Sequence, residues 1–188
     1  MRSIVQVGDT ALRGIASEIP LESIDTTYIR SLIADMKALL EKEEYGVALA
    51  APQVGESVRL FIVSGKAVAK RSRSTKKRGQ SADAPEISGE LSGEDTVYIN
   101  PAVIRTSKAR NDKHEGCLSV RGKWGIVSRA EKVTIRAYDE HGKKITRGAS
   151  GFLAHIFQHE LDHLDGVLYT DKALDLYDES TDESRLEV

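Results

Sequence analysis

Gln158-His159-Glu160-Leu161-Asp162-His163-Leu164 places two histidines four residues apart, with a glutamate directly after the first. On an α-helix, residues i and i+4 share a face with Cβ atoms ~5–6 Å apart, so both imidazoles can bind one metal ion. The glutamate projects close enough to hold a metal-bound water and accept its proton. This stretch therefore predicts a helix that carries the site of a metal-dependent hydrolase.

Apolar residues cover most of the circumference of this predicted helix. They are Phe152, Leu153, Ile156, Phe157, Leu161 and Leu164. A helix that is apolar nearly all round is buried, so its histidines should be buried as well. Ser150 is expected to cap the start of the helix, and Gly166 is expected to end it after Leu164.

The rest of the chain predicts one earlier helix and several strands. Helical spacing of apolar residues indicates a helix over roughly 23–43, and a small-residue loop, Gly46 to Gly55, follows it. Strands are expected at 59–64, 96–106, 110–119, 125–130, 132–139 and 143–149. The predicted fold is a single α+β domain in which antiparallel or mixed strands surround a central buried helix. The catalytic domain would span 1–177, with an acidic tail at 178–188.

Composition narrows the functional classes. The chain has 188 residues, a formal charge of -2 and a pI near 6.2, which give no sign of a DNA or anionic-membrane partner. No apolar run approaches the ~18 residues that a membrane span needs. A single cysteine, Cys117, allows no internal disulfide and suits a reducing compartment. The predicted location is the cytoplasm.

Residues 65–95 differ in composition from the rest of the chain. Residues 65–80 contain seven Lys/Arg and no acid, whereas 81–95 contain five Asp/Glu and no base. The absence of periodicity predicts a long, mobile insertion, and a solvated surface loop is the ordinary interpretation. The sharper hypothesis is that the basic half, Lys66 to Arg78, touches RNA or makes a transient contact with a ribosome.

A hydrolytic metal site usually takes three protein ligands and leaves one position open. Cys117, within Glu115-Gly116-Cys117-Leu118-Ser119, is a candidate for the third ligand beside the two motif histidines. A Cys/His/His set suits Zn²⁺ or Fe²⁺ rather than Mg²⁺ or Ca²⁺. Taken alone, a single cysteine is more often a small core residue, so the residues by themselves leave both interpretations open.

Three stretches resemble the signature motifs of the peptide deformylase family. They are Gly46-Val47-Ala48-Leu49-Ala50-Ala51-Pro52-Gln53, Glu115-Gly116-Cys117-Leu118-Ser119 and Gln158-His159-Glu160-Leu161-Asp162-His163-Leu164. Their order along the chain also matches that family, although Ala48 replaces the second glycine usual in the first motif. The resemblance covers nearly the whole chain apart from 65–95 and the tail.

This resemblance implies a set of roles. Cys117, His159 and His163 would bind the metal, Glu160 would be the general acid/base, and Gln53 with the backbone N–H of Leu118 would form an oxyanion hole. The implied ion is Fe²⁺, with Zn²⁺, Ni²⁺ or Co²⁺ able to substitute. The implied substrate is an N-formyl-methionyl nascent peptide, bound by Gly46, Val47, Ala48, Glu115, Gly116, Phe152, His155 and Ile156. Arg129 would pair with Glu115 and orient a metal ligand.

Two other functions remain as alternatives. One is a zinc endopeptidase whose third ligand, Glu179 or Glu183, lies beyond the helix. The other is a deformylase-like scaffold without activity that works as a binding module.

His155 also stands four residues before His159, but only the His159/His163 pair has a glutamate after its first histidine. His155 is therefore interpreted as a pocket or core residue.

Overall fold

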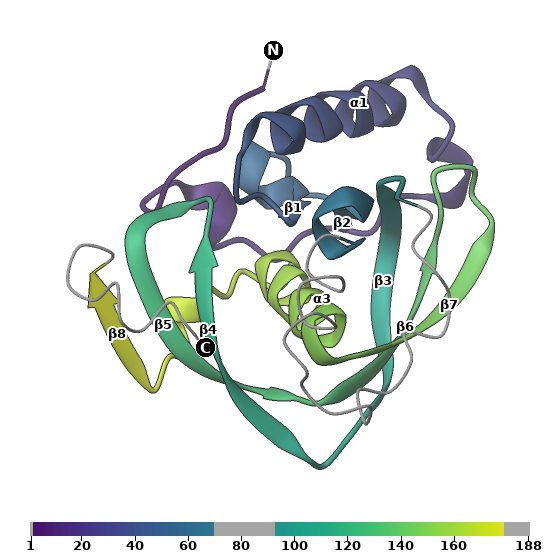
Figure 1. Ribbon diagram of the computed structural model, residues 1–188. Helices are drawn as coiled ribbons and strands as arrows, with labels where there is room; N and C mark the ends of the chain where they lie inside the picture. The colour runs from purple at the N-terminus through teal and green to yellow at the C-terminus, as the bar shows by residue number, and fades with distance from the viewer. Residues whose placement is uncertain (1, 70–92, 179–188) are drawn as a thin grey trace.

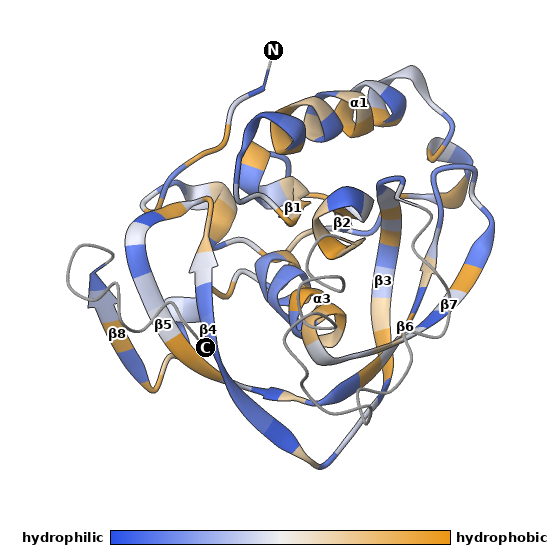
Figure 2. Cartoon of the chain, in the orientation of Figure 1, coloured by the Kyte–Doolittle hydropathy of each residue, from blue (hydrophilic) through white to orange (hydrophobic). Residues whose placement is uncertain are grey.

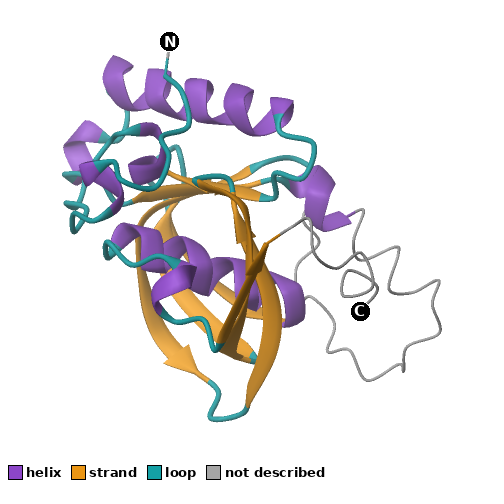
Figure 3. Cartoon of the chain, turned by 90° about the vertical axis from the view of Figure 1, so that its left-hand side faces the viewer, coloured by secondary structure: helices purple, strands orange, loops and turns teal. Residues whose placement is uncertain are grey.

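A single helix lies inside a curved arrangement of strands, and a second helix lies outside it (Figures 1 and 3). The computed structural model describes residues 2–69 and 93–178. Its helices are α1 (Thr27–Lys42) and α3 (Gly151–Leu164), with short 3-10 helices η1 (Thr10–Leu12), η2 (Leu21–Ser23), η3 (Ala51–Val54) and η4 (Tyr169–Asp171). The predicted α+β class with a central buried helix is confirmed.

Two sheets enclose α3. The larger has the order β1-β2-β3-β6-β7 and consists of β1 (Ala48–Ala50), β2 (Leu60–Val63), β3 (Thr96–Thr106), β6 (Lys132–Tyr138) and β7 (Lys144–Ser150). The smaller has the order β4-β5-β8 and consists of β4 (Arg110–Cys117), β5 (Val120–Ala130) and β8 (Asp175–Asp178). All neighbouring strands in these sheets pair antiparallel.

The larger sheet has a helix packed on each face, and β2 shows why. Successive side chains of a strand point to opposite faces. Leu60 and Ile62 pack in the cluster that contains the apolar face of α1, whereas Phe61 and Val63 pack in the cluster that contains α3. Because both faces of β2 are covered, its run of apolar residues is continuous rather than alternating.

Aromatic rings join α3 to this sheet. Phe61 and Tyr98 stack with centroids 4.8 Å apart, and Phe157 of α3 contacts Tyr98 edge-on at 5.0 Å. Such contacts add to the free energy of burial. They hold the motif helix at a fixed position beneath the sheet.

The predicted first helix begins later than expected. Residues 21–23 form the separate turn η2, and α1 begins at Thr27 because Thr26 is extended and its hydroxyl accepts a hydrogen bond from the Ile29 amide.

Ser150 occupies the N-cap position of α3, but its side chain makes no capping hydrogen bond with the helix. Gly166 ends that helix as predicted, with φ +72°. A Cβ at Gly166 would lie 2.6 Å from the carbonyl oxygen of Arg13, so the chain crossing there requires glycine.

Several other segments differ from the sequence prediction. The loop expected at 46–55 contains β1 and η3, and β5 begins at Val120 rather than at 125. β8 was not expected at all, and it pairs with β5 from Lys123↔Asp178 to Ile126↔Asp175. Residues 65–69 form a helical turn with Val68 buried. The remainder of the predicted insertion, 70–92, and the tail from 179 lie outside the described residues.

The burial of β4 increases along its length. Residues 110–114 are exposed and the strand is mostly hydrophilic in Figure 2. Glu115 is then buried, and Gly116 and Cys117 are partly buried. A Cβ at Gly116 would lie 3.2 Å from the ring of Trp124, so glycine allows this ring to cover the strand. The last three residues of β4 therefore lie in the interior, next to α3.

Within the described parts of the chain, no helix combines the length and the apolar character that crossing a membrane requires.

Candidate active site

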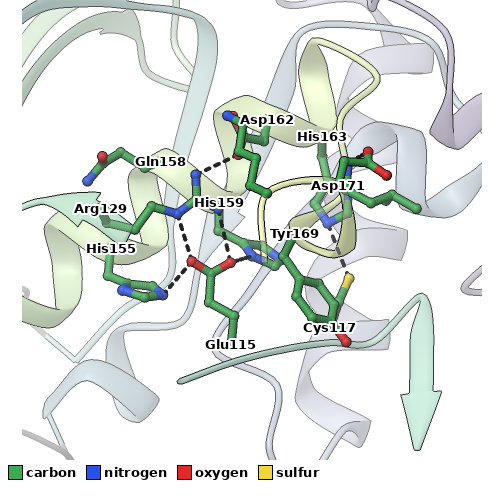
Figure 4. A network of polar contacts seen from close by, with 12 residues as sticks. Glu115, Cys117, Arg129, His155, Gln158, His159, Asp162, His163, Tyr169 and Asp171 are labelled. Atoms are coloured by element: carbon green, nitrogen blue, oxygen red, sulfur yellow. Dashed lines mark hydrogen bonds and ion pairs between the residues drawn. The ribbon is translucent and has the colours of Figure 1, made fainter. Parts of the chain in front are cut away.

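The three predicted metal ligands meet at one place. His159 and His163 project from the same face of α3, with ring centroids 4.9 Å apart, and Cys117 reaches them from the end of β4 (Figure 4). The ligand atoms of all three lie within 4.8 Å of one another, and Cys117 Sγ lies 3.2 Å from His163 Nε2. Convergence of these donors from two distant segments favours the ligand interpretation of Cys117 over an ordinary core cysteine.

The donor set fits a borderline-soft divalent ion. One ring nitrogen of His159, Nδ1, is hydrogen-bonded to Glu115 Oε2 at 2.7 Å, which leaves Nε2 available as a ligand atom. A thiolate and two imidazoles suit Zn²⁺ or Fe²⁺. With three protein donors, a tetrahedral ion would keep one position for water or substrate.

Glu115 is the centre of a buried network behind the ligands (Figure 4). Its carboxylate binds Arg129 through Nε at 2.7 Å and Nη2 at 3.0 Å, His155 Nε2 at 2.8 Å and His159 Nδ1 at 2.7 Å. Burial alone would raise the pKa of Glu115, but the hydrogen bonds from His155, His159 and Arg129 outweigh it and lower the pKa below its usual range. These contacts favour the anionic form of Glu115, and its hydrogen bond with Nδ1 orients the ring of His159.

The network continues away from the ligands. Arg129 Nη1 lies 2.6 Å from Asp162 Oδ2, and Lys172 Nζ lies 2.6 Å from Asp162 Oδ1. Arg129 is 4% exposed, and two carboxylates, those of Glu115 and Asp162, balance its charge. The expected pairing of Glu115 with Arg129 is present, and Asp162 adds a partner that the sequence did not reveal.

Glu160 lies next to His159 on α3 and is buried. Its Oε2 has no hydrogen-bond partner in the part of the chain that the structure describes. Burial raises the pKa of Glu160 to about 7, although the charge of nearby His159 lowers it. A carboxylate whose pKa lies near neutral pH can both accept and donate a proton there.

Gln53 is fixed by three hydrogen bonds. Its Oε1 accepts from the Ala50 amide at 2.8 Å, and its Nε2 donates to Cys117 Sγ and to Ser119 Oγ, each at 3.3 Å. The side-chain amide of Gln53 therefore points towards the candidate ligand cysteine. Leu118 lies in the turn between β4 and β5, directly after Cys117.

The residues predicted to bind substrate lie around these groups. Val47 and Phe152 pack against the cluster that contains Ala48 and Ile156. Gly46 precedes β1, and a Cβ there would lie 2.9 Å from the side chain of Leu40. The predicted role of these residues and of Gly116 in substrate binding remains a prediction.

His155 was expected to line the pocket, and it has a further contact. Its Nε2 hydrogen-bonds to Glu115, and burial, opposed by this carboxylate, lowers the pKa of its imidazole. His155 also borders a cavity of about 380 Å³, together with residues from β4, β5 and the start of α3. It is therefore in a position to contact both Glu115 and a molecule in that cavity.

Sequence reasoning missed two residues that hold His159 and Gln53. The ring of Tyr169 stacks on that of His159 with centroids 6.1 Å apart, and its hydroxyl donates to the Lys123 carbonyl at 2.8 Å. Ser119 is fully buried and accepts from Gln53. No spacing rule points to Tyr169, whereas Ser119 lies within the motif Glu115-Gly116-Cys117-Leu118-Ser119, which is the signal for it.

Comparison with known proteins gives a consistent result. A family model described as polypeptide deformylase matches residues 1–179. Peptide deformylase 2 of Ralstonia nicotianae is 36% identical over 90% of this chain and 85% of its own length. Peptide deformylase of Halothermothrix orenii is 38% identical over 94% of this chain and 96% of its own.

Solved structures show the same likeness. A class I type b peptide deformylase from Acinetobacter baumannii superposes with a TM-score of 0.72 and 30% identity, covering 90% of this chain and 96% of that one. A peptide deformylase from Synechococcus elongatus in complex with actinonin gives 0.72 and 30%, covering 93% and 79%. Since the family model and these relatives span nearly the whole chain, the chain belongs to the peptide deformylase family.

Proposed function

We infer that the protein is a metal-dependent hydrolase that removes the N-formyl group from formyl-methionine at the N-terminus of newly synthesised polypeptides. The observation that carries this inference is the meeting of Cys117, His159 and His163 beside buried Glu160, in a chain of the deformylase family. The products would be formate and a free amino terminus.

In the proposed mechanism, Cys117, His159 and His163 would hold the ion. The chemistry that a divalent ion supplies in such a site is a lowered pKa of water, towards ~7. Glu160 accepts a proton from the attacking water as the water oxygen bonds to the formyl carbon. Glu160 then gives this proton to the methionine nitrogen as the carbon–nitrogen bond breaks. Glu160 Oε2, which has no hydrogen-bond partner among residues 2–69 and 93–178, supports this role.

Gln53 and the backbone N–H of Leu118 are proposed to stabilise the formyl oxygen as it gains negative charge. Removing one such donor in comparable sites costs on the order of 3 kcal/mol of transition-state stabilisation. The support is geometric, because Ala50 fixes the Oε1 end of Gln53 and leaves Nε2 directed towards Cys117.

The direct test is formate release from a short formyl-methionyl peptide by anaerobically purified, iron-loaded protein. Loss of release after chelation and recovery after adding Fe²⁺ would support the proposed reaction. Absence of release from protein that carries one metal per chain would contradict it and favour the binding-module alternative.

We propose Fe²⁺ as the ion and Cys117 as an essential ligand. Anaerobically purified protein is expected to contain about one iron per chain, and Cys117→Ala is expected to lower metal affinity by at least about 10–100-fold, because a thiolate is lost from a three-donor site. Elemental analysis after dialysis measures this. Arg121→Ala, which replaces an exposed residue of the adjacent strand β5, is the matched control.

Full metal content in Cys117→Ala would contradict the assignment. It would favour the endopeptidase alternative, whose candidate ligands Glu179 and Glu183 lie outside the described residues.

A transient ribosome contact through Lys66 to Arg78 and a cytoplasmic location remain predictions. Only 66–69 of that basic stretch are described, and Lys66 pairs with Glu41 at 3.5 Å in an exposed ion pair. Deleting 66–78 is expected to reduce co-sedimentation with ribosomes at low salt, because phosphate contacts by basic side chains weaken as salt rises. Unchanged co-sedimentation would contradict this contact.

A further inference from the structure

We propose that residues 4–7, which we call the N-terminal strap, hold the two oxyanion donors in position, and that Gln6 is a positioning residue for the reaction. This inference rests on the proposed function, since it concerns the placement of Gln53 and Leu118. Neither the family motifs nor the ligand set includes the strap.

The strap is hydrogen-bonded to both donor-bearing segments. The Val5 amide donates to the Gln53 carbonyl at 2.9 Å, on the η3 side. Gln6 Nε2 donates to the Leu118 carbonyl at 3.0 Å, and the Val7 amide donates to the Ser119 carbonyl at 2.8 Å, on the side of the β4–β5 turn. Three successive residues thus connect two segments that are far apart in the sequence.

Two kinds of side-chain contact also join these segments among the described residues. Gln53 Nε2 lies 3.3 Å from both Cys117 Sγ and Ser119 Oγ, and Leu118 packs against the apolar cluster that contains Ala51 and Val54 of η3. Donors that stabilise an oxyanion must lie within about 2.7–3.1 Å of it, so small shifts of one segment weaken the effect. The strap bonds to the backbone of both segments, so it restrains both donors at once.

Both ends of the strap are fastened. Before it, Arg2 pairs with Glu56 at 2.8 Å and with Asp35 at 3.0 Å, and the first strap residue, Ile4, packs against the cluster on the α1 side. After it, the Asp9 side chain accepts from the Ala11 amide at 2.9 Å and starts η1, whose Leu12 is fully buried. An extended segment held at both ends has a fixed register against its neighbours.

Gln6 offers a way to test the strap without damaging the core. Its side chain is exposed, so its hydrogen bond to Leu118 is not required to bury apolar surface. Removing this bond should therefore affect the Leu118 backbone more than it affects folding.

The experiment compares Gln6→Leu, Gln6→Arg and Ser3→Ala in the full-length, iron-loaded protein. Gln6→Leu removes the donor, whereas Gln6→Arg keeps N–H donors on a long side chain. Ser3→Ala is the control, an exposed polar residue just before the strap. For each variant, kcat and KM for a formyl-methionyl peptide, metal content and the midpoint of thermal unfolding are measured.

Gln6→Leu is expected to lower kcat by about threefold to tenfold, the range of one net hydrogen bond, with KM and metal content unchanged. Gln6→Arg is expected to recover most of this loss, and Ser3→Ala to match the wild type. Unchanged kcat in Gln6→Leu, or a loss that follows metal content or unfolding instead, would overturn the proposal. If the metal-loaded wild type itself releases no formate, the proposed function fails, and the strap proposal fails with it.

Discussion

Replacing Glu160 with glutamine is expected to reduce formate release by about 10²–10⁴-fold, the usual contribution of a general acid/base. Glutamine keeps the shape of the side chain but cannot accept the proton of the attacking water. Glu160 is buried, and its Oε2 has no partner among the described residues. Within the described part of the chain, the substitution therefore breaks no hydrogen bond of that oxygen, and it removes the proposed proton acceptor.

The same substitution should not destabilise the protein. Burial holds the pKa of Glu160 at about 7, above the value of an exposed glutamate. A carboxyl group whose folded pKa is raised binds its proton more tightly when folded, so its ionisation lowers the free energy of unfolding above the unfolded pKa. Glutamine does not ionise. Chelated Glu160→Gln protein at pH 8 is therefore expected to unfold at a temperature no lower than the chelated wild type.

Asp165→Asn is the matched control for Glu160→Gln. Asp165 follows α3 directly, is largely exposed and pairs with Arg59 at 2.7 Å, so the same acid-to-amide change there should leave kcat within about twofold. Formate release and metal content are measured for both variants. More than a tenth of wild-type activity in metal-loaded Glu160→Gln would contradict its role as the acid/base.

The motif helix was predictable because its signals are local. The His-Glu-x-x-His spacing and the apolar residues around it lie within one helix, and Gly166 marks its end. β8 was not predictable in this way. Asp175-Leu176-Tyr177-Asp178 has acidic ends and only two central apolar residues, and it becomes a strand because β5 offers a free edge. Propensity is a weak guide where pairing with a distant strand decides the structure.

The same distinction separates the predicted and missed parts of the site. Cys117 and Glu160 lie within recognisable motifs, and the structure brings both to the two histidines. Asp162 also lies in a motif, but its contact with Arg129 of β5 depends on how α3 packs against the smaller sheet. Tyr169 stacks on His159 only because the chain turns back after Gly166. Such contacts join remote segments and leave no periodic pattern in the sequence.

Glu115→Ala is expected to be the most damaging single change to the network behind the ligands. It leaves Arg129 buried with Asp162 as its remaining carboxylate, and breaking such a pair costs about 3–5 kcal/mol in free energy of unfolding. It also removes the partner of His159 Nδ1, and loss of such a partner typically lowers metal affinity by about 10–100-fold. Urea unfolding of the chelated protein measures the first effect.

Metal titration measures the loss of metal affinity, and the fluorescence of Trp124 can follow it. Trp124 is the only tryptophan, and its ring covers Gly116, the residue before Cys117. Its fluorescence should therefore respond when an ion binds at Cys117. Glu43→Ala is the control, because Glu43 is partly exposed, its partner Arg121 is exposed, and such surface pairs contribute about 0–1 kcal/mol.

A double variant, Glu115→Met with Arg129→Met, distinguishes an unpaired buried charge from a simple loss of packing. If the cost of Glu115→Ala comes from leaving Arg129 under-compensated, removing both charges should restore part of the stability. Metal affinity should remain low in the double variant, since His159 still lacks its carboxylate partner. Wild-type metal affinity in either variant would show that Glu115 does not orient His159. A double variant less stable than Glu115→Ala would show that Asp162 still compensates the charge of Arg129 after Glu115 is removed, and would contradict the unpaired-charge explanation.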